Sequence, residues 1–421
     1  MKLVCPRVIR GNRGDLLSRW GILSTLAALG VDNAAVFCAR ARHVPPGPFR
    51  PYAYGPVYNL LPPPAGWRAL ARADTLLWTG GLDLQDDSSL AKLGHMLVLF
   101  SIYRGLGLRV AALMQGAGPL TTAPGRALAR AILDRVDCFV ARDPGSLALL
   151  ASLGSRTPLV PSHDGVFLDG FDGQAVPAAE AAAIAALGAR PAGRPLVAVN
   201  LRLWFHFTSG LVPYQFARQT YRQRAQPRMA AFVEAMAALV RALREQTDAR
   251  VVLVSMYEPG VEPWEDDLPL LRRLKQRFVA DDAVVVAEHD FTIPGLYALM
   301  ARFDLVIGTR LHATLAALRA GVPAIHVAYT LKGRDIFAAL GLDAYAVDIE
   351  QVIARPAAAA DLAARALADA ALRERVAAIT AQAVTTNRRL LGDLVAASFR
   401  APHAAPSGPV AAGTPPVGSK A

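Results

Sequence analysis

Short apolar runs, each about as long as a buried strand, alternate with amphipathic helical stretches over most of the chain. In the first half these runs cover residues 2–9, 36–39, 74–78, 110–114 and 138–141. In the second half they cover residues 196–200, 250–255, 283–287, 304–308 and 324–328. The stretches between them have helical periodicity and often end at a glycine, as residues 16–29 do at Gly30. Alternating strands and helices predict parallel sheets covered by helices, which is the α/β class.

The length of the chain predicts more than one domain. With 421 residues, of which 53% are hydrophobic, the chain is long for a single core. We expect two Rossmann-like domains facing across a cleft, residues 1–173 and 196–350, joined by an Ala-, Gly- and Pro-rich linker at 174–195. A C-terminal helical segment is expected at 356–400, and the low-complexity tail at 401–421 is expected to be disordered. The Pro- and aromatic-rich residues 43–66 predict an irregular loop.

Charged residues and glycines gather where predicted strands end and helices begin. Arg310 and His312 lie between a strand and a helix, and Lys332 leaves the next strand at the same edge. Ligands bind at this edge of open α/β sheets, and a helix start favours an anion. Arg142 occupies the matching junction in the first half. Solvated polar residues in a first helical turn are the alternative, but two such arginines in two domains favour an anion held between them.

Two further glycine turns follow predicted strands, and each has a structural alternative. Residues 11–15, GNRGD, form a turn whose backbone can approach a ligand, although the spacing is not that of a dinucleotide fingerprint. Asp15 there is either a ligand contact or a helix cap. Gly80 and Gly81 precede Asp83, Asp86 and Asp87. Close aspartates can bind a metal, but capping of the helix from residue 88 is the favoured interpretation, so no metal site is predicted.

Charge and cysteine usage narrow the function classes. The net charge is +11 and the pI about 9.9, which suits anionic small molecules, a phospholipid surface or nucleic acid. Basic residues do not form blocks with interleaved aromatics, so nucleic acid is not expected. The three cysteines, Cys5, Cys38 and Cys138, are far apart and indicate neither a zinc site nor a disulfide framework.

The absence of targeting signals bears on location. The amino-terminal sequence lacks the apolar core of a signal peptide. The most apolar run, residues 96–103, is too short to span a bilayer. We therefore expect a cytoplasmic protein, with at most peripheral association at the inner face of the membrane.

Seven motifs, taken in order, carry a resemblance to a known family. They are GNRGD at 11–15, TGGLDLQD at 79–86, QGAGPL at 115–120, ARDPGS at 141–146, SHDGVF at 162–167, VNLR at 199–202 and TRLHATLAALRAGVPAIHVAYTLK at 309–332. Over residues 2–342 the chain resembles the polysaccharide pyruvyl transferases. The resemblance implies two domains arranged as in GT-B glycosyltransferases, without a metal or other cofactor. It also implies transfer of a pyruvyl group from phosphoenolpyruvate to a sugar, as a ketal, on a cell-surface glycan or its lipid-linked precursor.

The resemblance also implies roles for individual residues. Arg142, Arg310, Leu311 and Lys332 would bind the donor, and His312 with Arg142 would be catalytic. Acceptor contacts would come from Asn12, Asp15, Gly80, Gly81, Asp83, Asp164 and Arg202. Pro144 and Leu82 depart from the family pattern, in the loop after Arg142 and at a third glycine of the second motif.

Chemistry favours the same residues. Phosphoenolpyruvate carries a phosphate and a carboxylate, which call for convergent cations, and an imidazole moves protons near neutral pH. A nucleotide-sugar glycosyltransferase of the same architecture and a non-catalytic carbohydrate-binding relative are the alternatives.

Overall fold

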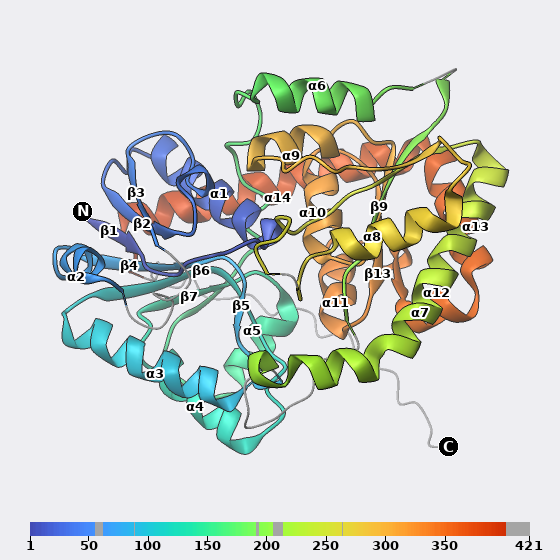
Figure 1. Ribbon diagram of the computed structural model, residues 1–421. Coiled ribbons are helices and arrows are strands. Elements are labelled where there is room, and N and C mark those ends of the chain that lie inside the picture. The colour runs from blue at the N-terminus through green and yellow to red at the C-terminus, as the bar shows by residue number, and fades with distance from the viewer. Residues whose placement is uncertain (55–61, 88, 191–192, 205–213, 263, 401–421) are drawn as a thin grey trace.

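The computed structural model describes residues 1–54, 62–87, 89–190, 193–204, 214–262 and 264–400, with no side-chain description for 214–222. The tail expected to be disordered, residues 401–421, lies outside this description, as does part of the loop expected at 43–66. In the described part the chain forms two α/β domains, each built on a parallel sheet (Figure 1).

The N-terminal sheet has the strand order β3-β2-β1-β4-β6-β7-β8, and β5 pairs with β6. Its strands are β1 Leu3–Cys5, β2 Ala34–Cys38, β3 Phe49–Ala53, β4 Thr75–Thr79, β5 Leu82–Leu84, β6 Arg109–Ala117, β7 Cys138–Ala141 and β8 Leu159–Pro161. The central strands β4, β6 and β7 are almost entirely buried. Burial on both faces explains why they read as continuous apolar runs in the sequence.

Helices cover both faces of this sheet. They are α1 Arg13–Ala28, α2 Pro64–Ala71, α3 Leu90–Gly105, α4 Ala123–Leu133 and α5 Pro144–Ala151. In Figure 1, α3 and α4 lie on one face, and α1 lies on the other together with the last helix of the chain. The start of α5 is capped by Asp143, which accepts a 2.7 Å hydrogen bond from the Ser146 amide, and Pro144 occupies the first helical position.

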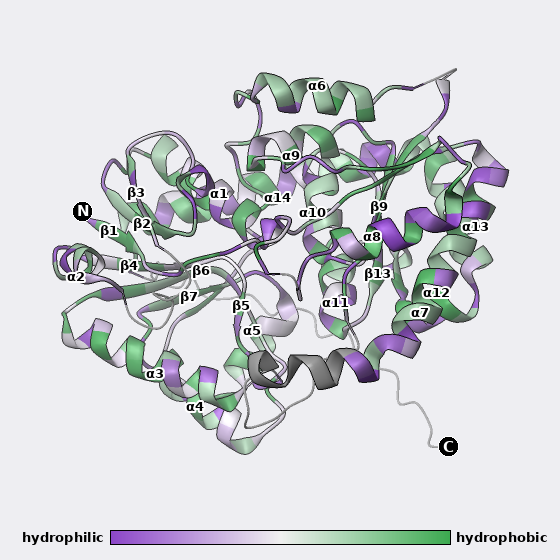
Figure 2. Cartoon of the chain, in the orientation of Figure 1, coloured by the Kyte–Doolittle hydropathy of each residue, from purple (hydrophilic) through white to green (hydrophobic). Residues whose placement is uncertain are grey.

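The C-terminal sheet has the strand order β11-β10-β9-β12-β13-β14. Its strands are β9 Leu196–Asn200, β10 Arg250–Leu253, β11 Val284–Val286, β12 Leu305–Gly308, β13 Ala324–Ala328 and β14 Ala346–Asp348. Its helices are α7 Tyr214–Thr247, α8 Leu268–Lys275, α9 Ile293–Met300, α10 Leu311–Arg319, α11 Leu331–Ala339, α12 Ile349–Ala354 and α13 Pro356–Ala368. Helix α6, Ala178–Leu187, lies in the stretch between the sheets. Hydrophobic residues concentrate on the strands of both sheets (Figure 2).

One local expectation was wrong, and other local features were not anticipated. Residues 43–66 are not irregular throughout, because β3 pairs in parallel with β2. Pro51 is tolerated in β3 because the strand lies at the sheet edge, where a missing donor costs little. The strand β14 was not expected. The helical pattern from 356 is two helices, because the Asp369 side chain caps a new helix, α14 (Ala370–Ala396), by accepting from the Leu372 amide.

Helix α14 belongs to the cores of both domains. Leu372, Val376 and Ala383 pack in the core of the C-terminal domain. Leu391 and Leu394, farther along the same helix, pack with Ile22 and other residues of the N-terminal domain. A single helix therefore connects the two cores.

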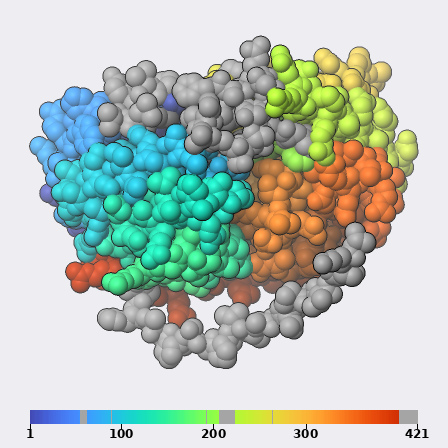
Figure 3. All heavy atoms as spheres, turned by 90° about the horizontal axis from the view of Figure 1, so that it is seen from below, coloured from blue at the N-terminus to red at the C-terminus, as the bar shows by residue number. Residues whose placement is uncertain are grey.

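Ion pairs also join the domains. Arg13, the first residue of α1, donates to Asp290 at 2.6 Å and to the Ser255 carbonyl at 3.2 Å. Arg42 lies 2.7 Å from Glu258, and His43 lies 2.8 Å from the same carboxylate. The space-filling view shows the halves in contact along a continuous boundary (Figure 3).

Candidate active site

Two cations converge where β6 and β7 of the N-terminal domain meet α11 of the C-terminal domain. Arg142 follows β7 and is 6% exposed, and Lys332 is the second residue of α11. Gly116 in β6 makes room for both: a Cβ there would overlap Lys332 Nζ and would lie 3.0 Å from Arg142 Nε. This close approach explains a glycine near the end of the buried strand β6.

Only some of the hydrogen-bond donors of the Arg142 guanidinium have partners among its neighbours. Its Nη1 donates to Asp164 Oδ2 at 2.9 Å. Its buried Nε has no hydrogen-bond partner in the described part of the chain. A buried N–H group of a guanidinium without a partner is costly, so this donor is available to an anion placed beside Gly116.

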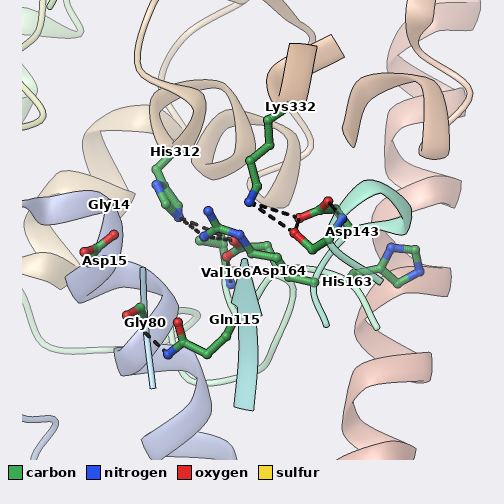
Figure 4. A network of polar contacts seen from close by, with 12 residues as sticks. Gly14, Asp15, Gly80, Gln115, Asp143, His163, Asp164, Val166, His312 and Lys332 are labelled. Atoms are coloured by element: carbon green, nitrogen blue, oxygen red, sulfur yellow. Dashed lines mark hydrogen bonds and ion pairs between the residues drawn. The ribbon is translucent and has the colours of Figure 1, made fainter. Parts of the chain in front are cut away.

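Lys332 reaches across the domain boundary into a polar pocket. Its Nζ donates to the Ala117 carbonyl and to Ser146 Oγ, both at 3.1 Å, and lies 3.7 Å from Asp143 Oδ2 (Figure 4). Burial, and after it the charge of Arg142, lowers the pKa of Lys332 to about 7, against the opposing effect of Asp143. An amine with this pKa gains a proton readily when an anion arrives.

His312 lies beside this pair, in the first turn of α10. Its Nε2 is 3.4 Å from Asp164 Oδ2 and 3.4 Å from Arg142 Nη1. Gly14 in the first turn of α1 packs against the imidazole, and a Cβ there would lie 2.5 Å from His312 Nδ1. The second glycine of the GNRGD turn is thus required for the contact of α1 with His312.

Asp164 links His312 and Arg142. Burial alone would raise the pKa of Asp164, but the charges of His312 and Arg142 and its hydrogen bonds hold that pKa well below its usual range. A permanently ionised carboxylate between an imidazole and a guanidinium fixes both side chains (Figure 4). The structure therefore brings together Arg142, His312, Lys332 and Asp164, three of which were expected at the donor site and one at the acceptor site.

Arg310 does not join this cluster in the described part of the chain. Its Nε donates to both carboxylate oxygens of Asp267, at 2.7 and 2.9 Å, and its Nη2 donates to the Glu265 carbonyl at 2.6 Å. The guanidinium also lies over the Tyr257 ring. Burial by itself would lower the pKa of Arg310, but the charge of Asp267 outweighs burial and raises this pKa. Its donor role stays a prediction, since these contacts are those of a buried ion pair.

Leu311 and Arg202 make their described contacts outside the cluster of Arg142, His312, Lys332 and Asp164. Leu311, the first residue of α10, is half-buried against the core of the C-terminal domain. Arg202 follows β9, where it donates to the Tyr329 hydroxyl, stacks over that ring and lies 3.3 Å from Glu265. Arg202 thus lies with the Glu265–Arg310 group, and its acceptor role stays a prediction.

Four of the residues expected to contact the acceptor gather around Arg7, which the sequence did not single out. Arg7 lies 3.0 Å from Asp15 Oδ2 and 2.9 Å from Asp83 Oδ2, and it donates to the Gly80 carbonyl. A Cβ at Gly81 would lie 2.5 Å from Arg7 Nη2. Burial by itself would raise the pKa of Asp83, but the charges of Arg7 and Lys92 outweigh burial and lower this pKa to about 2. No motif marked Arg7, because only the fold brings its partners together.

Asn12 and Asp86 have structural roles in their helices. Asn12 caps α1 by accepting from the Gly14 and Asp15 amides. Asp86 accepts from the Thr121 and Thr122 amides and so binds the start of α4. The helix after it, α3, is capped by Ser89 instead. Among the described residues no group of His, Cys, Asp or Glu side chains is arranged to hold a metal ion.

None of the described helices is both long enough and apolar enough to cross a bilayer.

Two α/β domains, each built on a parallel sheet, are the architecture of the GT-B fold. HepE from Anabaena, solved in complex with UDP-glucose, has this fold: it is 16% identical, with a TM-score of 0.56, over 94% of this chain and 100% of that chain. UDP-GlcNAc 2-epimerase from Neisseria meningitidis, solved bound to UDP-GlcNAc, is 11% identical, with a TM-score of 0.52, over 92% of this chain and 99% of that chain. At such identities the likeness concerns the fold.

The family follows from the sequence match. The family model for polysaccharide pyruvyl transferase matches residues 12–330, most of the chain. The protein belongs to this family of transferases. No curated protein matches the chain.

Proposed function

We propose that the protein transfers a pyruvyl group from phosphoenolpyruvate to two hydroxyls of a sugar and forms a cyclic ketal. The observation that carries the proposal is the convergence of Arg142 and Lys332 at Gly116, beside the His312–Asp164 pair. Arg142 and Asp164 come from the N-terminal domain, and His312 and Lys332 come from the C-terminal domain. A small anion bound here would therefore be enclosed between the two domains. Membership of the family supports the same reaction.

The donor fits the charges at this site. Phosphoenolpyruvate has a phosphate and a carboxylate, and both are bound best by charge-assisted hydrogen bonds. The free Nε of Arg142 and the Nζ of Lys332 lie on the same side of Gly116. One anionic group of the donor therefore binds between them, and no metal ion is needed in the proposed site.

His312 moves the protons in the proposed reaction. Protonation of the donor methylene to a methyl group leaves positive charge on the neighbouring carbon. A first sugar hydroxyl adds to that carbon and loses its proton. A second hydroxyl then displaces phosphate, which leaves with the remaining proton as inorganic phosphate. Asp164, 3.4 Å from His312 Nε2, orients the imidazole and stabilises its protonated form during these transfers.

The acceptor binds on the N-terminal side in this proposal. The Arg7 group, with Asp15, Asp83 and the Gly80–Gly81 turn, offers buried carboxylates and glycine backbone where hydroxyls can be bound. A glycan or lipid-linked sugar of a cell-surface polysaccharide is the acceptor class that the family supports. We expect the reaction in the cytoplasm, with at most peripheral contact with the membrane.

The reaction is tested by ³¹P NMR of phosphoenolpyruvate with the protein and a pool of sugar and lipid-linked acceptors. The expected result is inorganic phosphate that forms only when acceptor is present, together with a product that carries an added pyruvyl mass. Consumption of a UDP-sugar instead would support the glycosyltransferase alternative. Consumption of neither donor with any acceptor would support a carbohydrate-binding protein and contradict the proposal.

A further inference from the structure

Helix α14 contacts both elements that carry the His312–Asp164 pair. Near its middle, Thr380 Oγ1 donates to the Leu318 carbonyl at 2.7 Å, in the last turn of α10. Two turns later, Asn387 contacts the turn 163–167 of the N-terminal domain. His312 lies in the first turn of α10. Asp164 belongs to the turn 163–167 that Asn387 contacts. Thr380 thus contacts α10 at the end away from His312, and this helix is also packed in the core of the C-terminal domain, whereas Asn387 contacts the turn that contains Asp164 itself.

Asn387 is completely buried, and its whole amide is used. Its Oδ1 accepts from the His163 amide at 3.0 Å. Its Nδ2 donates to the carbonyls of Asp164 and Phe167, each at 3.0 Å, and to that of His163 at 3.3 Å. Four backbone groups of one short turn are therefore tied to a single side chain from the other end of the chain.

The turn presents Asp164 in one orientation. Asp164 Oδ1 accepts from the Val166 amide at 3.0 Å within the turn, so Oδ2 is left to face Arg142 and His312. Without Asn387 the carbonyls of His163 and Asp164 would keep only the Ser162 hydroxyl and the Phe167 amide as donors. The buried Phe167 carbonyl and the His163 amide would lose the contacts that Asn387 makes with them, a cost that favours movement of the turn. Such a movement would carry the carboxylate away from the imidazole.

We propose that Asn387 is a positioning residue, which fixes Asp164 against His312 and Arg142 and so sets the rate of the transfer step. The residue lies outside residues 12–330, which the family model matches. The effect on rate rests on the proposed pyruvyl transfer, whereas the effect on the geometry of the pair does not.

The test compares Asn387→Leu, similar in size but without the amide, with Thr380→Val as a matched control. Thr380→Val also removes a buried hydrogen bond from α14 to a backbone carbonyl, but it leaves the turn 163–167 untouched. We expect kcat to fall roughly 10- to 100-fold in Asn387→Leu, since displacements of about 1 Å can cost as much. It should change less than about 3-fold in the control. If Asn387→Leu does not fold, Asn387→Ser is measured in the same way.

A double-mutant cycle separates positioning from stability. In an Asp164→Asn background, Asn387→Leu should lower kcat by less than about 3-fold, because the two residues act through one contact. Equal fold-losses in both backgrounds, or an unchanged kcat, would refute the proposal.

A spectroscopic arm does not depend on turnover. The ¹⁵N resonances of the His312 imidazole, assigned by their loss in His312→Gln, should shift in Asn387→Leu and not in Thr380→Val. If phosphoenolpyruvate is not consumed but these resonances shift, the positioning role stands and the proposed function fails. Unchanged resonances in Asn387→Leu would overturn the positioning role.

Discussion

Proton uptake on donor binding follows from the environment of Lys332. The pKa of Lys332 is lowered to about 7, first by burial and then by Arg142, from an ordinary value of 10.5. At pH 8 about nine-tenths of the molecules therefore carry a neutral amine before the donor arrives. An anion bound between Arg142 and Lys332 favours the ammonium and raises that pKa again. Binding should then take up close to one proton, roughly 0.9 at most.

Calorimetric titration with phosphoenolpyruvate in buffers of different ionisation enthalpy measures this number. At pH 8 the donor phosphate, whose second pKa is about 6, is already ionised and contributes little. Lys332→Met should bind the donor more weakly and take up almost no proton. At pH 6 Lys332 is largely protonated beforehand, so its uptake should vanish. Donor binding by the unchanged protein at pH 8 without proton uptake, or equal uptake by Lys332→Met, would refute the placement of the donor at Lys332.

Three substitutions test other parts of the account. His312→Gln should keep the fold and reduce phosphate release by roughly 10²–10⁴-fold, the usual contribution of a general acid/base; near-normal turnover in ³¹P NMR would remove His312 from the mechanism. Gly14→Ala should push the His312 imidazole aside and lower kcat up to about 100-fold. The control is Gly94→Ala in α3, where a Cβ meets nothing within 4 Å, and it should leave kcat unchanged. Equal effects of the two substitutions on kcat would contradict the close packing at His312. Arg310→Met should lower the free energy of unfolding by about 3–5 kcal/mol, because it leaves the buried carboxylate of Asp267 unpaired; an unchanged denaturation midpoint would contradict a structural ion pair.

Much of the fold could be predicted from local patterns. The strand, helix and strand around His312 were predicted to within a residue or two, since apolar runs, a C-terminal glycine at Gly321 and Pro323 mark their ends. The strand β3 was missed because an edge strand with Pro51 and exposed residues lacks the buried pattern of its neighbours. The C-terminal helical segment was predicted, but its division into α13 and α14 was not, because only the capping contact of Asp369 separates the two helices.

The site was harder to predict than the fold, because its contacts join distant parts of the chain. Sequence placed Arg142, His312 and Lys332 at strand ends, and the structure brings them together. It also placed Arg310 there, but the partner of Arg310 is Asp267, 43 residues earlier, and nothing local marks that pairing. Arg7 and Asn387 carry no motif, so their roles follow only from the carboxylates and carbonyls that the fold packs around them.

The most direct test of the central claim is thermal unfolding with phosphoenolpyruvate or UDP-glucose present. A ligand at about 100 times its dissociation constant stabilises the folded protein by about 2.7 kcal/mol. We predict that phosphoenolpyruvate raises the unfolding temperature, that UDP-glucose does not, and that Arg142→Met loses the effect. Protection by UDP-glucose without protection by phosphoenolpyruvate, or full protection of Arg142→Met, would contradict a donor site at Arg142 and Lys332.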